Sequence, residues 1–268
     1  MNRKRFWKWF RAIVIIYFTG GIFLYFFQEK LMFHPVSLPI DYQYSFAIPF
    51  REINLELDAK KNLNIVQFIV PPTLCKGVVL YFHGNMENIS LYAGNAINFT
   101  RHGYEVWMMD YPGFGKTTGK RTEKNLYADA LEFYNLARLR FPPDSIIIYG
   151  KSIGTGIACQ LASIRNCRRL ILETPFYSTD ALAKHYFPIY PVMLLTKFSF
   201  PNYQYVEKIN APISIFHGTA DEVIPYKQSE RLMKVIRRGE LITIERGKHN
   251  NLNDFPVFHR KLDSLLEE

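Results

Sequence analysis

The sequence predicts a three-layer α/β fold with a mostly parallel central sheet, a small lid insertion and one N-terminal transmembrane helix. Three observations lead to this prediction. From residue 78 onward, short apolar segments alternate with segments of helical pattern. Two segments before them alternate with period two, which is typical of an antiparallel hairpin. Near the N-terminus, sixteen consecutive residues carry no charge.

The N-terminal segment is predicted to be a membrane anchor. Residues 12–27 form the apolar run, about 24 Å long as a helix, and residues 1–11 form a basic flank. A cleaved signal peptide is the alternative, but cleavage requires small residues after the apolar run and residues 25–28 provide none. The positive-inside rule predicts a cytoplasmic N-terminus, with the rest of the chain on the extracytoplasmic side.

Residues 28–49 are predicted to be a linker, and residues 50–268 one domain that begins with a hairpin. Residues 52–57 alternate between polar and apolar side chains, as a half-buried strand does. Residues 64–70 are expected to pair with them across a polar turn at residues 58–62. This hairpin is the antiparallel lead-in to the sheet.

The segments that follow are short and almost entirely apolar, which indicates parallel strands buried on both faces. These strands are expected at residues 78–82, 106–109, 146–149, 170–172, 213–216 and 241–245. Helices are expected between them at residues 89–101, 123–140, 153–166, 227–237 and 252–266. The alternation breaks once, at residues 175–208, and this insertion is predicted to be a lid because it is too short for a domain.

The charge and the cysteines exclude several classes of protein. The chain has 33 basic and 24 acidic residues, but five of the basic ones lie before residue 12, and the remaining 257 residues carry only +4. A nucleic-acid partner is therefore not expected. The three cysteines form no Cys-x-x-Cys motif or Cys/His ligand spacing, so no metal is expected. The glycine patterns of nucleotide-binding loops are also absent, and no cofactor is predicted.

A pattern typical of a catalytic serine follows the strand at residues 146–149. Residues 150–154 read GKSIG, which matches Gly-x-Ser-x-Gly at a strand–turn–helix junction. Glycines at both ends of the pattern permit a tight turn that lifts the serine above the sheet. Ser152 is therefore the candidate nucleophile.

A serine nucleophile requires a base to accept its proton and an acid to orient the base. Among seven histidines, His249 is the candidate base, because it follows the last strand in a loop that can reach Ser152. Asp221 follows the preceding strand and is the candidate acid. Glu173, at the end of another strand, is the alternative acid, although a structural hydrogen-bonding role is expected for it.

Backbone N–H groups near Ser152 are expected to form an oxyanion hole. One is that of Ile153, at the start of a helix, and the other is that of Asn85, with Met86 as the second choice. His83 and His217 each end a strand and precede a glycine, so they are expected to shape loops.

Five motifs in order carry a resemblance to a known family. They are HGNMEN at residues 83–88, DYPGFGKTTG at 110–119, GKSIG at 150–154, HGTADEVIP at 217–225 and GKHN at 247–250. In these motifs the chain resembles the serine hydrolases of the α/β-hydrolase fold, and more narrowly the single-pass, membrane-anchored α/β-hydrolase-domain proteins. Lys116-Thr117-Thr118 departs from the small polar residues usual in the second motif. Members of this family hydrolyse esters, thioesters, lipids or peptides, so the resemblance implies the machinery and leaves the substrate open.

The leading hypothesis is hydrolysis of a carboxylic ester or thioester through an acyl-Ser152 intermediate. Nine aromatic residues among the 34 of the predicted lid, together with the membrane anchor, favour a small-molecule substrate with an apolar acyl or lipid-like group. Packing of the lid on itself explains the same aromatics equally well. A peptidase with the same triad and a non-catalytic binding protein are the alternatives. The sequence offers no recognisable anchor for a peptide terminus, and a binding protein has no need of all three triad residues.

Overall fold

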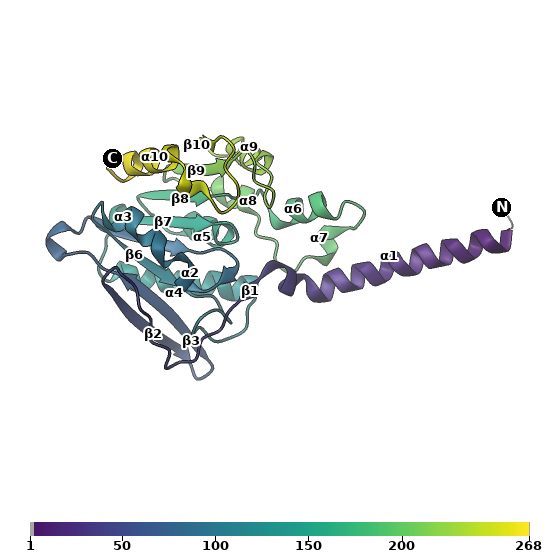
Figure 1. Cartoon of the computed structure of the whole chain (residues 1–268), viewed down its shortest axis with the longest axis horizontal. Helices are drawn as coiled ribbons and strands as arrows, with labels where there is room; N and C mark the ends of the chain where they lie inside the picture. The colour runs from purple at the N-terminus through teal and green to yellow at the C-terminus, as the bar shows by residue number, and fades with distance from the viewer. Residues whose placement is uncertain (1–2, 268) are drawn as a thin grey trace.

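An eight-stranded sheet forms the centre of the structure, a computed structural model that describes residues 3–267 (Figure 1). Its strand order is β10-β9-β8-β7-β4-β6-β3-β2. All pairs from β10 to β6 are parallel, whereas β3 is antiparallel to both of its neighbours. The strands are β2 (Phe50–Asp58), β3 (Lys61–Phe68), β4 (Gly77–Phe82), β6 (Tyr104–Met109), β7 (Ile146–Lys151), β8 (Arg169–Glu173), β9 (Ile213–Gly218) and β10 (Gly239–Ile244). The predicted α/β fold with a mostly parallel sheet is confirmed.

Helices cover both faces of the sheet and complete the three layers. On one face, Phe133 of α4 and Ile157 of α5 pack in a core with the sheet. On the other face, Phe99 of α3 and Phe258 of α10 pack in a second core. The helices of the domain outside the insertion are α2 (Ile89–Tyr92), α3 (Ile97–Thr100), α4 (Glu123–Arg138), α5 (Gly154–Ile164), α9 (Lys227–Met233) and α10 (Pro256–Glu267), with 3₁₀ turns η1 (Pro72–Leu74), η2 (Ala93–Ala96), η3 (Pro143–Ser145) and η4 (Leu252–Asp254).

The segment predicted to be helical at residues 89–101 is helical, but it is not one continuous α-helix. The segment consists of α2, η2 and α3 in succession. Gly94 and Asn95 lie in its middle, and both are poor helix formers. The Asn95 side chain donates to Tyr81 Oη at 3.1 Å. The 3₁₀ turn therefore supplies a hydrogen-bond partner for the hydroxyl of the buried Tyr81.

The insertion predicted at residues 175–208 contains three short helices, α6 (Thr179–Tyr186), α7 (Val192–Leu195) and α8 (Asn202–Val206). The Ser178 side chain caps α6 by accepting from the N–H of Ala181. Pro191 precedes α7 directly and Pro188 lies in the connection between α6 and α7. We call residues 179–197 the α6–α7 hairpin.

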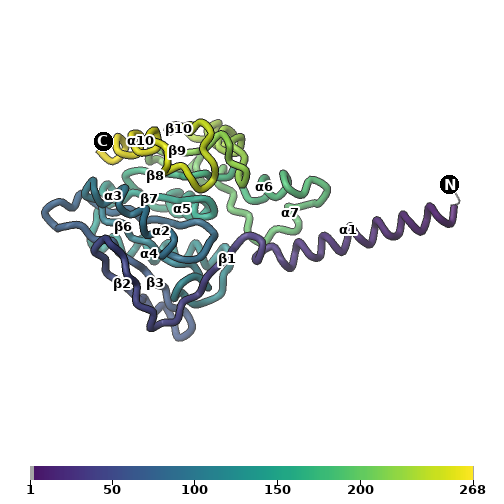
Figure 2. The backbone as a smooth tube through the Cα atoms, in the orientation of Figure 1, coloured from purple at the N-terminus to yellow at the C-terminus, as the bar shows by residue number. Residues whose placement is uncertain are grey.

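Helix α1 (Arg3–Met32) projects from the domain and runs beside the α6–α7 hairpin (Figure 2). It extends five residues past Phe27, into the segment predicted to be a linker. An 18-residue window of it has a mean hydropathy of 1.8 and none of that window is buried, so α1 is long and apolar enough to cross a membrane.

The chain after α1 is attached to the domain and does not form a free tether. Phe33 is buried, with its ring 5.1 Å from that of Phe198. Strand β1 (His34–Pro35) then pairs in parallel with β5 (Met86–Glu87). The N–H of Leu38 donates to the carbonyl of Gly115 at 2.7 Å. These contacts fix the end of α1 relative to the loops at the carboxyl edge of the sheet.

Candidate active site

Ser152 lies on the sharp turn between β7 and α5. Its φ of +52° places a residue with a side chain in the left-handed region, which is strained. The turn is held by two backbone hydrogen bonds: the N–H of Ser152 donates to the carbonyl of Glu173 at 2.9 Å, and its carbonyl accepts from Thr155 at 3.0 Å. The strained serine is thus presented at the carboxyl edge of the sheet.

The two glycines of the motif are required by close packing. A Cβ added at Gly154 would lie 2.2 Å from the carbonyl oxygen of Phe82. One added at Gly150 would lie 2.8 Å from the Cβ of Ala158. Both distances are shorter than a van der Waals contact, so a side chain at either position would push α5 away from the sheet.

The three residues predicted as a triad are brought together from three separate loops. His249 Nε2 lies 2.9 Å from Ser152 Oγ, and His249 Nδ1 lies 2.8 Å from Asp221 Oδ2. All three residues are buried. Because the carboxylate can only accept, Nδ1 carries the proton and Nε2 is left as the acceptor for the serine hydroxyl. This is the arrangement in which histidine can take a proton from serine.

The carboxylate of Asp221 is held as an anion. Its Oδ1 accepts from the N–H groups of Val223 and Ile224, each at 2.8 Å. Burial alone raises the pKa of Asp221, but the hydrogen bonds from His217, His249 and Ile224 outweigh it, and the pKa lies below its usual value. A charged carboxylate in this position can stabilise an imidazolium on His249.

His217 contacts the acid, a role that its sequence position did not indicate. Its Nε2 lies 2.8 Å from the carbonyl of Ile224 and 3.2 Å from Asp221 Oδ2. Both partners accept, so Nε2 carries a proton, and Nδ1 lies 2.6 Å from the Ser229 hydroxyl oxygen. His217 therefore donates to Asp221. The available signal was the spacing of four residues between His217, at the end of β9, and Asp221 in the loop that follows.

The alternative acid, Glu173, is engaged elsewhere. Its carboxylate is paired with Lys151 Nζ and accepts from the hydroxyl of Tyr149. Both side chains are buried beneath the nucleophile turn. No hydrogen bond joins Glu173 to His249, although the structure describes both residues.

His83 joins two loops at the same edge of the sheet. Its Nε2 lies 3.2 Å from Asp110 Oδ1, which also accepts from the N–H of Ile89 at 3.0 Å. Burial raises the pKa of Asp110, and contact with His83 offsets only part of this effect. His83 therefore holds the loop after β4 against the loop after β6, as a loop-shaping residue does.

The predicted oxyanion donors lie beside Ser152. Residues Asn85 and Ile153 line the same cavity as Ser152, and among residues 3–267 neither of their backbone N–H groups has a hydrogen-bond acceptor. The N–H of the second choice, Met86, donates to Tyr92 Oη at 3.4 Å. Two free donors next to a nucleophile can stabilise a negative oxygen.

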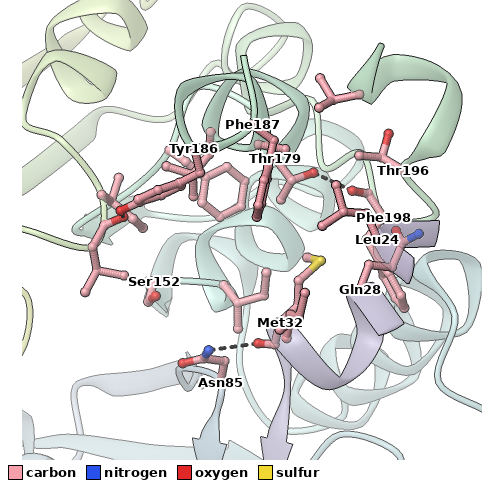
Figure 3. A pocket seen from close by; sticks show the side chains of 18 of the residues that line it. Leu24, Gln28, Met32, Asn85, Ser152, Thr179, Tyr186, Phe187, Thr196 and Phe198 are labelled. Atoms are coloured by element: carbon pink, nitrogen blue, oxygen red, sulfur yellow. Dashed lines mark hydrogen bonds between the residues drawn. The ribbon is translucent and has the colours of Figure 1, made fainter. Parts of the chain in front are cut away.

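A cavity of about 440 Å³ extends from Ser152 between α1 and the α6–α7 hairpin (Figure 3). One wall is a face of α1 formed by Leu24, Gln28, Leu31 and Met32. The opposite wall consists of apolar residues of the hairpin, namely Leu182, Ala183, Tyr186, Phe187, Val192 and Leu195. Among the described residues that line it, the exposed Glu222 is the one with a charged side chain. Among the residues that the structure describes, no group of His, Cys, Asp or Glu could hold a metal ion.

Comparison with known proteins assigns the family. The family model described as serine aminopeptidase, S33, matches residues 74–204, which include Ser152 but not Asp221 or His249. Human alpha/beta hydrolase domain-containing protein 17B is 30% identical over 214 residues, covering 78% of this chain and 73% of the human protein. The chain belongs to the α/β-hydrolase family.

This α/β-hydrolase is also similar to alpha/beta hydrolase domain-containing protein 17C of Xenopus tropicalis, with 32% identity over 197 residues. That match covers 70% of the chain but 61% of the frog protein, so the chain spans about three fifths of that relative's length. Solved structures share the fold. The esterase PF2001 of Pyrococcus furiosus has a TM-score of 0.66 at 15% identity, covering 88% of this chain and 97% of the esterase. Est1E of Butyrivibrio proteoclasticus, with ferulic acid bound, has a TM-score of 0.65 at 18% identity, covering 80% and 96%.

The contribution of α1 to the cavity of this α/β-hydrolase was not predicted. The sequence indicated an anchor, whereas Leu24, Gln28, Leu31 and Met32 lie on one helical face and line the cavity. Their spacing of four, three and one residues is typical of such a face. Because the preceding residues 12–27 are uncharged on every side of the helix, this spacing does not stand out.

Proposed function

We propose that the protein is a serine hydrolase that cleaves a carboxylic ester or thioester through an acyl-Ser152 intermediate. The observation that carries this proposal is the continuous contact from Ser152 Oγ through His249 to Asp221 at the end of an apolar cavity. A nucleophile, a base and an orienting acid in one hydrogen-bonded series are what acyl transfer requires.

In the first half of the reaction, His249 Nε2 accepts the proton of Ser152 as Oγ attacks the carbonyl carbon. The oxygen of the tetrahedral intermediate becomes negative and accepts from the N–H groups of Asn85 and Ile153. The intermediate then expels the alcohol or thiol, which receives the proton from His249. The acyl group remains bound to Ser152.

In the second half, a water molecule donates a proton to His249 and attacks the acyl carbon. The same two N–H groups stabilise the second intermediate. Its collapse releases the carboxylic acid, and the proton returns from His249 to Ser152. The charged Asp221 stabilises the imidazolium in both halves.

The cavity favours a substrate with an apolar acyl group. Its walls are aliphatic and aromatic except for a few polar groups, and a space of about 440 Å³ accommodates an acyl chain of moderate length. When the carbonyl carbon of the substrate lies at Ser152, its acyl chain would extend along the cavity between α1 and the hairpin.

A serine peptidase with the same triad is the second candidate, favoured by the description of the matching family model. An aminopeptidase requires a carboxylate that binds the peptide's amino group, and within residues 3–267 Glu222 is the acidic residue that lines the cavity. A non-catalytic binding protein is the third candidate.

One set of measurements separates the three functions. Fluorophosphonate labelling of wild type, abolished in the Ser152→Ala variant, is expected for both enzymes and not for a binding protein. A panel of acyl esters and thioesters of increasing chain length, run beside a panel of aminoacyl and peptide amides, then separates the two enzymes. Turnover of the amides above that of the esters would overturn the proposal.

We further propose that residues 12–27 cross a membrane, with residues 1–11 cytoplasmic and the domain at 50–268 extracytoplasmic. The length and composition of α1 support the span, and the basic flank supports the orientation. A reporter fused after Glu268 should behave as extracytoplasmic, and the protein should retain its N-terminus. A mature N-terminus beyond Phe27 would instead identify a signal peptide.

A further inference from the structure

The α6–α7 hairpin is docked on the side of α1. The ring of Tyr190 stacks on that of Tyr17, with centroids 4.9 Å apart and planes inclined by 8°. Tyr17 Oη donates to the carbonyl of Ile189 at 3.1 Å. Closer to the domain, the Gln28 side chain donates to the carbonyl of Leu195 at 2.8 Å and accepts from the N–H of Lys197 at 2.7 Å. The hairpin is therefore attached to α1 at two levels.

These two levels determine how far the hairpin reaches along α1. Tyr17 and Gln28 are eleven residues apart, which is about 16 Å along a helix axis. Tyr17 lies well inside the uncharged run at residues 12–27. A bilayer that is crossed by this run therefore also surrounds the part of the hairpin that contacts Tyr17.

The composition of the hairpin suits that environment. Residues 186–195 contain no charged side chain, and Lys184 and Lys197 flank them. Three apolar side chains point away from the protein: Ile189 is 69% exposed, Met193 79% and Leu194 81%. Contiguous exposed apolar residues mark a surface that another apolar phase covers.

Several backbone polar groups of the hairpin are satisfied within the protein. Pro188 and Pro191 have no N–H to satisfy. The N–H groups of Tyr190, Val192 and Leu194 donate to carbonyls within the hairpin. The carbonyls of residues 189 and 195 accept from α1 side chains. Non-helical backbone is tolerated at membrane depth only when its polar groups are satisfied in this way.

We propose that the α6–α7 hairpin enters the lipid bilayer beside α1, and that the acyl chain of a lipid-borne substrate passes between the two to reach Ser152. The second half of this proposal rests on the proposed function. The cavity that ends at Ser152 lies between these same two elements, so an acyl chain follows an apolar path from the hydrocarbon to the nucleophile. Lys197 marks the headgroup level, with its ammonium 4.4 Å from the ring of Tyr25.

The first test measures bilayer entry without any catalysis. In a Trp7→Phe/Trp9→Phe background, which retains the buried Trp107, a tryptophan is introduced by Leu194→Trp. Leu139→Trp, after the end of α4, is the matched control, because both leucines are 81% exposed. The full chain is reconstituted in phosphatidylcholine vesicles with and without acyl-chain bromination. We expect blue-shifted emission and loss of most of the added fluorescence in brominated lipid for Leu194→Trp and not for Leu139→Trp. Equal quenching of the two variants would overturn bilayer entry.

The second test measures the path of the substrate. Met193→Asp places a charge on the exposed tip, and Leu139→Asp is its control. We expect Met193→Asp to lower turnover of a long-chain ester in vesicles by about tenfold or more, because a carboxylate resists transfer into hydrocarbon. Turnover of a short soluble ester and fluorophosphonate labelling of Ser152 should match the control, which shows that the variant folds.

The two tests separate the two proposals. Unchanged long-chain turnover in Met193→Asp would overturn the path between α1 and the hairpin even if Leu194→Trp is quenched. A wild-type chain that is never labelled by fluorophosphonate would refute the proposed function, while quenching would still decide whether the hairpin enters the bilayer.

Discussion

Tyr190 of the α6–α7 hairpin stacks face to face on Tyr17 of α1, although 172 residues separate them. Gly20 makes this contact possible, because a Cβ at that position would lie 2.2 Å from the Tyr190 hydroxyl oxygen. The pair therefore joins an element that the sequence marks as an anchor to one that covers the candidate active site. The first prediction follows from this contact.

Tyr190→Ala should loosen the hairpin from α1. Aromatic pairs contribute about 0.5–1.5 kcal/mol, so the undocked fraction should rise by about 2- to 13-fold. Trypsin cleavage after Lys184 and Lys197 in detergent measures this opening. Tyr203→Ala is the control, because it removes another stacked pair, with Tyr177, that does not involve α1. Equal acceleration of cleavage in both variants would show that the Tyr17 contact does not hold the hairpin.

Ser152→Ala and His249→Ala should each lower ester hydrolysis by about four to six powers of ten, because the series of proton transfers is interrupted. Circular dichroism should show unchanged folding. Ser163→Ala, on the same helix that follows Ser152, is the control and should retain activity. Near-normal turnover in Ser152→Ala would mean that the nucleophile is assigned wrongly.

Asp221→Asn should lower kcat by about 10⁴, because the amide no longer stabilises the imidazolium or the required tautomer of His249. Glu173→Gln should reduce kcat far less and instead lower stability, because Lys151 would be left buried without its partner. Steady-state kinetics and thermal melts of both variants separate the two roles. A milder kinetic loss in Asp221→Asn than in Glu173→Gln would assign the acid role to Glu173.

The stability of the protein should depend on pH through Asp221. Its pKa is lower in the folded chain than in the unfolded chain, so its contribution to the free energy of unfolding is full above the unfolded pKa of about 3.9 and declines as pH falls below it. Denaturation in detergent at several pH values should show that the difference in the free energy of unfolding between wild type and Asp221→Asn becomes smaller below about pH 4. The Asp144→Asn variant changes an exposed residue, and its free energy of unfolding should differ little from that of wild type at every pH. A difference for Asp221→Asn that becomes larger on acidification would contradict the sign.

Deletion of residues 1–27 should affect long acyl chains and spare short ones. The deletion removes Tyr17, which contacts the hairpin, and Leu24, which lines the cavity, but leaves Gln28 and the residues after it. Turnover of short soluble esters should stay nearly unchanged, while turnover of long-chain esters should fall in vesicles and also in free solution. Deletion of residues 1–16 retains both residues, so it should lower only the vesicle activity, through loss of local concentration. If both truncations behave alike in free solution, α1 is not a functional wall.

The central parallel strands were predictable because each is buried on both faces and therefore reads as an apolar run. Residues 78–82 and 146–149 were expected as strands, and β4 and β7 extend these ranges by one to two residues. The segment at residues 89–101 was expected to be helical and is, but a 3₁₀ turn divides it into two short α-helices. Gly94 and the Asn95–Tyr81 hydrogen bond interrupt it, and only the second of these requires the tertiary structure.

The site was predictable as far as topology dictates it. Ser152, Asp221 and His249 each follow a parallel strand, and the carboxyl ends of such strands meet at one edge of a sheet. The wall of the cavity was not predictable, because residues 12–27 of α1 are uncharged on every side and no pattern marks the face that lines the cavity. The pairing of β1 with β5 spans two residues, too few for any periodicity.

The attachment of α1 to the loop after β4 has a consequence for what this protein can reach. The side-chain amide of Asn85 donates to the backbone carbonyl of Met32 at 2.8 Å. The backbone carbonyl of Asn85 accepts from the N–H of His34 at 2.8 Å. With α1 in a bilayer, no flexible linker separates the helix from Asn85, which lies beside Ser152. The tilt of the helix, which responds to membrane thickness, would then set the height of Ser152 above the lipid. The protein would then cleave bonds that lie at one distance from the membrane surface, and it would not cleave the same bond placed nearer to the surface or farther from it.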